Sequence, residues 1–119
     1  MIEFTIIGQP PAKANNYEII FINGHRAMKK SKAMDAYEHS FLLQCPYRDI
    51  DIKDYFKCEI DVYFKTLASD IDNAAKGILD LLQKCKVIHN DNRCIDLHMR
   101  KFKDPVNPRC TIRIEEVKI

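Results

Sequence analysis

Hydrophobic periodicity in the second half of the chain constrains the fold more than any other feature of the sequence. Apolar and polar residues alternate over residues 56–64, as in a strand with one buried face. Over residues 73–84 apolar residues recur at spacings of three and four, which is typical of an amphipathic helix; the predicted stripe is Ala75, Ile78, Leu79 and Leu82. Alternation returns over residues 94–102. The sequence therefore predicts a strand, a helix and a second strand in succession.

The first half of the chain and its C-terminal end supply further elements. Asn23-Gly24 predicts a tight hairpin turn, and residues 31–45 predict a helix that Pro46 terminates. This helix is expected to bury a stripe made of Met34, Tyr37, Phe41, Leu42 and Cys45. Three more segments are predicted to be strands: residues 2–7, 17–22 and 110–117. The order of elements predicts an α+β fold, in which a mixed or antiparallel sheet carries two main helices.

Length and composition favour a single small domain over residues 1–119. A chain of 119 residues with 46% hydrophobic content can bury about two-thirds of its unfolded surface and needs no disulfide or structural metal to fold. The sequence has neither an apolar stretch of about 18 residues nor a basic leader, so we expect a cytoplasmic protein with no membrane partner. Its five cysteines lack Cys-x-x-Cys spacing, which argues against a zinc site and a disulfide framework. Cys45 and Cys58 are expected in the core.

Three carboxylates and one ammonium group surround the predicted central helix. Asp70 follows the first strand, Asp72 occupies the predicted N-cap, and Asp91 lies in a turn-rich segment before the next strand. Lys76 stands one helical turn beyond Asp72. Oxygen donors favour Mg²⁺ or Mn²⁺ over zinc. If these side chains meet in space, they form a metal site of the kind that cleaves phosphodiesters.

Simpler interpretations of the same residues remain open. An Asp-x-Asp-Asn segment before a helix is often only a capped turn. Lys76 can also be an intrahelical ion-pair partner of Asp72 and Asp80, although this leaves Asp70 and Asp91 unexplained. A calcium loop of the EF-hand type is excluded because alanine and leucine occupy the positions that require glycine and glutamate.

The distribution of charge is more informative than the net charge of +2. One basic run follows the predicted hairpin turn, and a second lies near the end of the strand over residues 94–102. Such runs often form only a solvated face. With the predicted carboxylate site nearby, we interpret the two basic runs as contacts for DNA phosphates. The candidate DNA-binding residues are Lys13, Arg26, Lys29, Lys30, Arg100, Lys101 and Lys103.

These residues resemble a known family, the RusA-type Holliday junction resolvases, which are small dimeric endodeoxyribonucleases of bacteria and their phages. The family signature is a strand, then Asp-x-Asp-Asn-x-x-Lys, a helix with a further aspartate, and an acidic pair opening the next strand. The matching residues are Asp70, Asp72, Asn73, Lys76, Asp80 and Asp91. The resemblance implies that Asp70, Asp72 and Asp91 hold Mg²⁺, for which Mn²⁺ can substitute, and that Lys76 is the essential basic residue beside the scissile phosphate.

The resemblance extends over most of the chain, including the opening strand that ends in Pro10-Pro11 and the helix through Tyr37. Two positions differ from the family pattern. Asn90 replaces one acid of the acidic pair, and Ser69 stands where relatives often carry arginine. The first difference bears on how the cation is positioned, and the second on one DNA contact.

The implied function is Mg²⁺-dependent, symmetric hydrolysis of four-way DNA junctions during recombination and repair. The resemblance also implies a homodimer, encoded by a bacterium or by a phage or prophage, because a four-way junction with approximate two-fold symmetry needs two matched cuts. A second hypothesis is a non-catalytic module that binds branched DNA and has a degenerate metal site. The junction preference comes from the resemblance alone, since other DNA or RNA substrates suit the same chemistry.

Overall fold

The computed structural model describes residues 1–11 and 17–118, apart from the side chains of Tyr17, Glu18, Lys30 and Asn73. The described elements, in chain order, are β1 (Ile2–Ile7), β2 (Tyr17–Ile22), β3 (His25–Lys30), α1 (Lys32–Gln44), β4 (Tyr55–Phe64), α2 (Ile71–Lys84), the short 3-10 helix η2 (Asp91–Arg93), β5 (Cys94–Lys103) and β6 (Arg109–Val117). None of the helices in these segments is long and apolar enough to cross a membrane.

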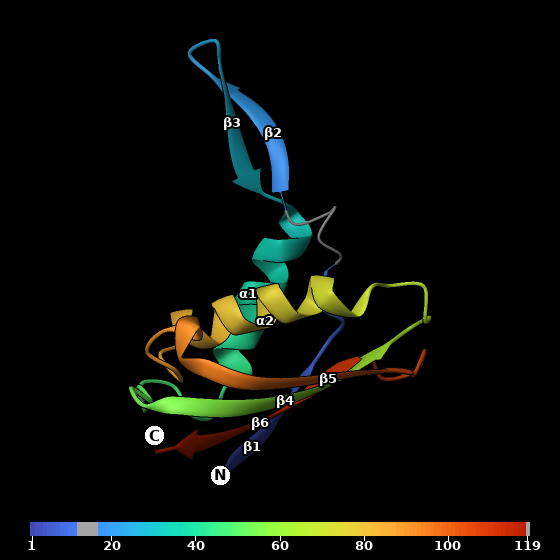
Figure 1. Cartoon of the computed structure of the whole chain (residues 1–119). Helices are drawn as coiled ribbons and strands as arrows, with labels where there is room; N and C mark the ends of the chain where they lie inside the picture. Colours follow the sequence, from blue (N-terminus) through green and yellow to red (C-terminus); the bar gives the residue numbers. More distant parts are fainter. Residues whose placement is uncertain (12–16, 119) are drawn as a thin grey trace.

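The main sheet has four strands in the order β1-β6-β4-β5. β6 is antiparallel to both β1 and β4, whereas β5 is parallel to β4. The parallel pair is joined by α2, as parallel neighbours require a crossover rather than a tight turn. This arrangement confirms the predicted α+β fold with a mixed sheet and two main helices (Figure 1).

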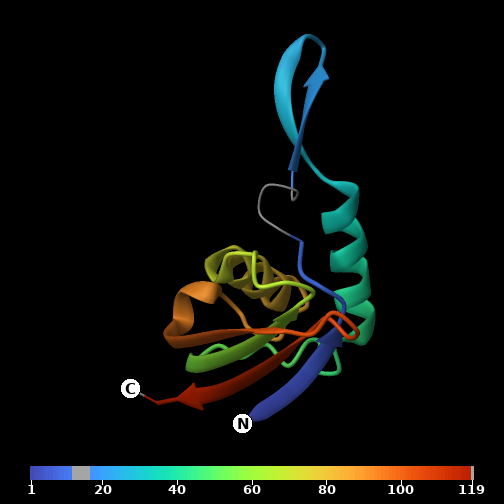
Figure 2. The same cartoon turned by 90° about the vertical axis from the view of Figure 1, so that its right-hand side faces the viewer.

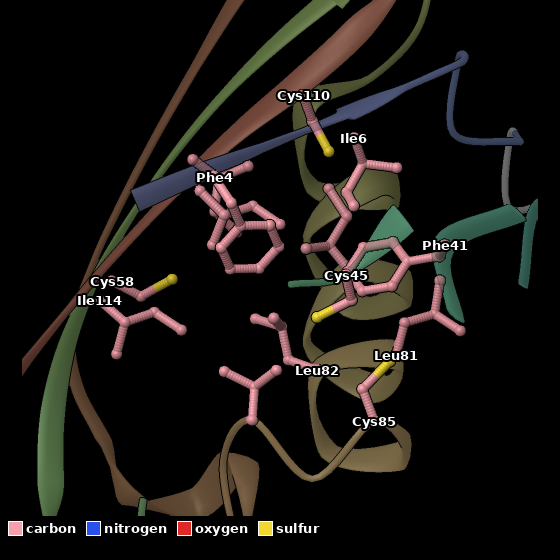
Figure 3. Close-up of a cluster of buried hydrophobic side chains, with 14 of the residues drawn as sticks. Phe4, Ile6, Phe41, Cys45, Cys58, Leu81, Leu82, Cys85, Cys110 and Ile114 are labelled. Atoms are coloured by element: carbon pink, nitrogen blue, oxygen red, sulfur yellow. The ribbon is translucent and has the colours of Figure 1, made fainter. Parts of the chain in front are cut away.

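Both helices lie on the same side of the sheet, and the core fills the space between them and the strands (Figures 1 and 2). Fully buried side chains come from both layers, among them Phe41 of α1, Ile78 of α2 and Ile60 of β4. Cys45 and Cys58 are buried in this core, as predicted, and both are free thiols (Figure 3). We call the sheet face under the helices the covered face and the other the open face.

Helix α2 begins earlier than the sequence predicted. Asp70, not Asp72, is the N-cap, with φ −73° and ψ 137°, and Asp72 lies in the first turn. The prediction that Asp72 caps the helix is therefore wrong. The earlier start places Ile71 and the buried Ala74 on the stripe that continues to Ile78. Burial of this longer apolar stripe, rather than a capping hydrogen bond from the Asp70 side chain, explains why the helix starts after the first of the two aspartates.

The predicted apolar stripes are correct in period but shifted at their margins. In α2 the buried residues are Ala74, Ile78, Leu81 and Leu82, whereas Ala75 and Leu79, which the sequence placed in the stripe, are half-buried. Likewise in α1, Leu42 is half-buried. Strand β5 departs furthest from the prediction, since Ile95 and Leu97 are 47% and 40% exposed. They are exposed because β5 forms an edge of the sheet, where one flank has no neighbouring strand.

Strands β2 and β3 form a separate hairpin that projects from the side of the molecule on which the helices lie (Figure 1). Ile22 pairs with His25, so the turn is Asn23-Gly24, with φ 52° and 81°. Two positive φ values mark a type I′ turn, and the predicted hairpin turn at Asn23-Gly24 is confirmed. The hairpin keeps apolar side chains in solvent, since Phe21 is 71% and Met28 is 67% exposed.

Candidate metal and nucleic-acid site

The candidate site lies where the loop over residues 65–70 leads from β4 into α2. Asp70 ends this loop and Asp72 follows in the first helical turn, and both side chains are exposed. Neither carboxylate has a hydrogen-bond or ion-pair partner among the described residues. The partial positive charge of the helix N-terminus favours two carboxylates at this position and favours a phosphate equally.

Lys76 brings the later aspartate to this helix. Its Nζ lies 3.6 Å from Oδ2 of Asp91 and 3.3 Å from Oδ1 of Asp80. The hydrogen bond and charge of Asp80, followed by the charge of Asp91, raise the pKa of Lys76 above its ordinary value. The ammonium therefore remains charged throughout the neutral range.

The turn that carries Asp91 is fastened to α2 through its backbone. The backbone N–H of Asp91 donates to Oε1 of Gln83 at 3.0 Å. Asn90 caps η2, because its side-chain oxygen accepts from the N–H of Asn92 at 2.9 Å. The residue that replaces an acid of the family pattern thus has a structural role here. Gln83 was not identified from the sequence, since an amide on a helix surface carries no pattern that reveals its partner.

The three predicted metal ligands are not gathered into one cluster in the part of the chain that the structure describes. Within those residues, no group of three or more histidine, cysteine, aspartate or glutamate side chains is arranged to hold a metal ion. The Lys76 ammonium that contacts Asp91 also pairs with Asp80. Asp80 lies about 12 Å from Asp72 along the helix axis, at a rise of 1.5 Å per residue. Thus the structure joins Lys76 to Asp91 and leaves Asp70 and Asp72 at the helix N-terminus.

The loop before α2 has two side-chain attachments to the rest of the molecule among the described contacts. At its start, the N–H of Lys65 donates to Oε1 of Gln9 at 2.7 Å. At its end, Nζ of Lys101 donates to the carbonyl oxygens of Leu67 and Ser69, at 3.0 and 3.1 Å. Lys101, a predicted DNA-binding residue, therefore holds the peptide that immediately precedes Asp70.

The alternation of β5 separates its basic residues between the two faces of the sheet. Lys101 and Lys103 pair in register with the buried Val62 and Phe64, so they belong to the covered face, at the end where α2 begins. Arg100 pairs in register with Asp61 on the open face, and its guanidinium contacts Glu59 at 2.8 Å and Asp61 at 3.0 Å. The basic run that looks continuous in sequence is therefore divided in space.

The remaining predicted DNA contacts lie on or before the hairpin. Arg26 and Lys29 are exposed on opposite faces of the β2–β3 ribbon, because they differ by an odd number of positions. Lys13 and the side chain of Lys30 lie outside the described residues. His89, the histidine nearest the site in sequence, pairs with Asp51 at 3.1 Å, which agrees with a role in the surface loop.

Sequence comparison identifies the family of the chain. A family model described as endodeoxyribonuclease RusA matches residues 8–115. The chain belongs to the RusA family. Its membership confirms the resemblance found in the acidic and basic motif, and the model covers nearly the whole protein. No curated protein matches the chain.

RusA membership implies an endonuclease that resolves Holliday junctions, and nucleases of this family generally depend on divalent metals. The donor set at the helix N-terminus fits such an ion chemically, since it consists of exposed carboxylate oxygens without described partners. The Lys76 ammonium, which contacts Asp91, is a further component of the candidate site.

Proposed function

We propose that the chain is a Mg²⁺-dependent endodeoxyribonuclease that hydrolyses phosphodiester bonds at four-way DNA junctions in recombination and repair. The observation that carries the proposal is the 3.6 Å contact between Lys76 and Asp91, which links a turn after α2 to the helix that Asp70 and Asp72 begin. RusA membership supports the same assignment.

Asp70, Asp72 and Asp91 are the proposed metal ligands. Mg²⁺ bound there would supply an activated water and neutralise charge on the phosphate oxygens. Without a cation, three carboxylates repel one another, so side chains in solvent turn apart. Asp70 and Asp72 can rotate because no described contact holds their carboxylates. We therefore propose that the ligands converge when the ion binds.

Lys76 is the proposed partner of the scissile phosphate. Its ammonium stabilises negative charge that develops in the transition state or protonates the leaving oxygen. Asp80 and Asp91 hold this ammonium charged and close to the site before DNA arrives. If the Lys76 ammonium moves from Asp91 to the phosphate, the Asp91 carboxylate is free to turn toward the helix N-terminus.

The DNA backbone is proposed to follow basic groups on the helix side of the molecule. Lys103 on the covered face and Arg26 and Lys29 on the hairpin are exposed and can reach phosphates. Lys13 and Lys30 remain proposed contacts on their sequence positions. Arg100 contributes less to this path, because its guanidinium is paired with two carboxylates on the open face.

Two matched cuts are proposed to come from two copies of the chain. A four-way junction has approximate two-fold symmetry, and a C₂ homodimer places two identical sites in matching positions. We also propose that the protein acts in the bacterial cytoplasm, where phage or chromosomal junctions arise.

A binding module without catalysis is the second candidate. It is favoured by one observation, the lack of a gathered ligand cluster among the described residues. In this case the basic groups bind junction phosphates and the acidic residues serve structural roles.

A labelled four-way junction incubated with the purified protein separates the two candidates. The nuclease proposal predicts symmetric nicks that appear with Mg²⁺ or Mn²⁺ and disappear with EDTA. It also predicts loss of cleavage in Asp70→Asn and Asp91→Asn variants that still bind the junction. A junction that is bound but stays intact with each metal would favour the binding module.

A further inference from the structure

Lys101 makes the contacts that single it out among the basic residues near the site. Its ammonium group donates to two carbonyl oxygens of one loop, those of Leu67 and Ser69. The two carbonyls belong to alternate residues at the end of the loop, so one side chain fixes the path of the backbone just before Asp70. The contacts cross from strand β5 to a segment more than thirty positions earlier in the sequence.

The same strand also starts at the other half of the proposed metal site. β5 begins at Cys94, directly after the η2 turn that carries Asp91. Its register with β4 is continuous from Lys57 to Phe64, a stretch that includes Lys101, and it shifts between Phe56 and Lys57, at the end next to Asp91. Strand β5 therefore connects the turn that carries Asp91 with Lys101, and its continuous register with β4 places Lys101 beside the segment that precedes Asp70.

We propose that Lys101 is a positioning residue, which holds the loop so that Asp70 can bind the divalent cation. The proposal rests on the metal-dependent function proposed above. Lys101 acts through the backbone of Leu67 and Ser69 and contacts neither the cation nor the reacting atoms. Supporting groups of this kind typically change metal affinity or activity by roughly 10- to 100-fold when they are removed.

The sign of the effect distinguishes positioning from simple electrostatics. A positive charge near carboxylates opposes cation binding, so deleting it tightens or preserves metal affinity if charge is all that matters. Loss of a positioning contact weakens metal affinity instead, because the loop samples conformations in which Asp70 is misplaced. The two roles therefore predict opposite changes for the same variant.

Lys103 provides a matched control. It lies two positions along β5, on the same covered face, it is exposed, and no described contact involves its ammonium. Lys101→Met and Lys103→Met remove the same charge and keep a similar apolar stem. Lys101→Arg retains donors that can reach the carbonyls and tests rescue.

The experiment measures Mn²⁺ binding to the DNA-free protein by titration calorimetry, and backbone ¹⁵N order parameters in EDTA. We expect Lys101→Met to weaken Mn²⁺ binding roughly 10- to 100-fold and to lower the order parameters of residues 67–70. Lys103→Met should leave both measurements near the parent values, and Lys101→Arg should restore part of each.

Unchanged order parameters in Lys101→Met would overturn the proposal, and so would Mn²⁺ binding that is as tight as in the parent or tighter. A parent chain that binds no Mn²⁺ would instead refute the proposed metal site. In that event the order parameters, which are measured without metal, still decide whether Lys101 holds the loop.

Discussion

Lys76 is the residue through which separate parts of the chain meet, because its ammonium contacts Asp80 on its own helix and Asp91 on the following turn. The sequence predicted that Lys76 and Asp80 share a stripe, since four positions make one helical turn. It also placed Lys76 beside Asp72, but no contact between these two side chains is described. The partner chosen by a long, exposed side chain depends on tertiary neighbours, which periodicity does not specify.

Replacing Lys76 should suppress catalysis without abolishing DNA binding. We expect Lys76→Ala to lower the single-turnover cleavage rate by several hundred-fold, because removing one preorganised donor raises the barrier by about 3 to 4 kcal/mol. Junction affinity measured in EDTA should change much less, since one phosphate contact among several is lost.

Lys84 is the matched control for this variant. It lies two turns further along α2 and pairs with Glu38 of α1, away from the site. Lys84→Ala removes the same charge from the same helix and should cleave at the parent rate. Equal cleavage by Lys76→Ala and the parent would refute the proposed role of Lys76.

Aspartates of the site and of the scaffold should respond oppositely to neutralisation. Asp70→Asn and Asp72→Asn should melt in EDTA at the parent temperature or slightly above it, because relief of repulsion offsets the lost attraction to the helix N-terminus and asparagine can occupy either helix-start position. Mg²⁺, which stabilises a protein that binds it, should no longer raise their melting temperatures.

Asp104 supplies the contrast. It accepts hydrogen bonds from Arg109 and from the N–H groups of Val106 and Asn107, and these contacts lower its pKa below the ordinary value. Its stabilising contribution is therefore present above the unfolded pKa and is lost as the pH falls through the lowered folded value. Asp104→Asn should reduce the melting temperature at pH 7, whereas a comparable drop for Asp70→Asn and Asp72→Asn would mark those two as structural.

At the scale of single elements, alternation and period predicted β1, β2, β4, β5, β6 and both long helices of the described chain, and the Asn23-Gly24 turn predicted the hairpin that β3 completes. The ends were not fixed by the pattern, as at α2, where two aspartates both suit an N-cap and the half-buried Ile71 and buried Ala74 favour the earlier start. Sequence alternation also could not show that β5 lies at an edge, because strand order depends on pairing between distant segments. The division of Arg100 from Lys101 and Lys103 could be predicted from period two, but which face carries the site could not.

The projecting hairpin should contribute to DNA binding through its charges. Each phosphate neutralised adds about 0.9 to the slope of log affinity against log salt. The double variant Arg26→Ala with Lys29→Ala should therefore weaken junction binding and flatten this slope by up to about 2. A control that removes two exposed lysines elsewhere, Lys53→Ala with Lys57→Ala, should leave the slope unchanged.

A slope for the hairpin variant that equals the parent slope would show that the hairpin does not contact phosphates. The Asn23-Gly24 turn is left intact in this design, so a change cannot arise from a disrupted ribbon.

At the scale of the whole molecule, a compact layer of sheet and helices carries one long projection. The radius of gyration is 15.0 Å, compared with about 13.5 Å for a compact domain of this length. Figure 2 shows that the hairpin accounts for the extension, since the sheet and α2 lie together at the opposite end. The contact of Lys101 with Ser69 joins distant segments through one side chain, and that of Gln83 with Asp91 joins a helix to the turn after it, so no periodic pattern predicts either contact.

The buried thiols predict how global stability depends on alkaline pH. Burial raises the pKa of Cys58 and Cys85 to about 12 and that of Cys110 to about 11. In the unfolded chain these thiols lose protons near their ordinary value of 9.0, so the unfolded state binds fewer protons above this pH. The free energy of unfolding should therefore fall as the pH rises from about 9 toward 11.

Urea denaturation at several pH values measures this effect, and a Cys58→Ala variant should show a shallower decline than the parent. A stability that stays constant over this range would mean that the thiols are accessible to solvent in the folded state. Stability below pH 8 should not depend on these groups, because they are protonated in both states.

The convergence of the carboxylates is tested most directly by a crystal structure of the protein soaked in Mn²⁺, with the ion located by its anomalous scattering. The expected result is an anomalous peak bound by oxygens of Asp70, Asp72 and Asp91 at about 2.0 to 2.2 Å, with the Lys76 ammonium beside it. An ion bound elsewhere, or an Asp91 that remains on the far side of Lys76 while Asp70 and Asp72 bind alone, would contradict the proposed metal site.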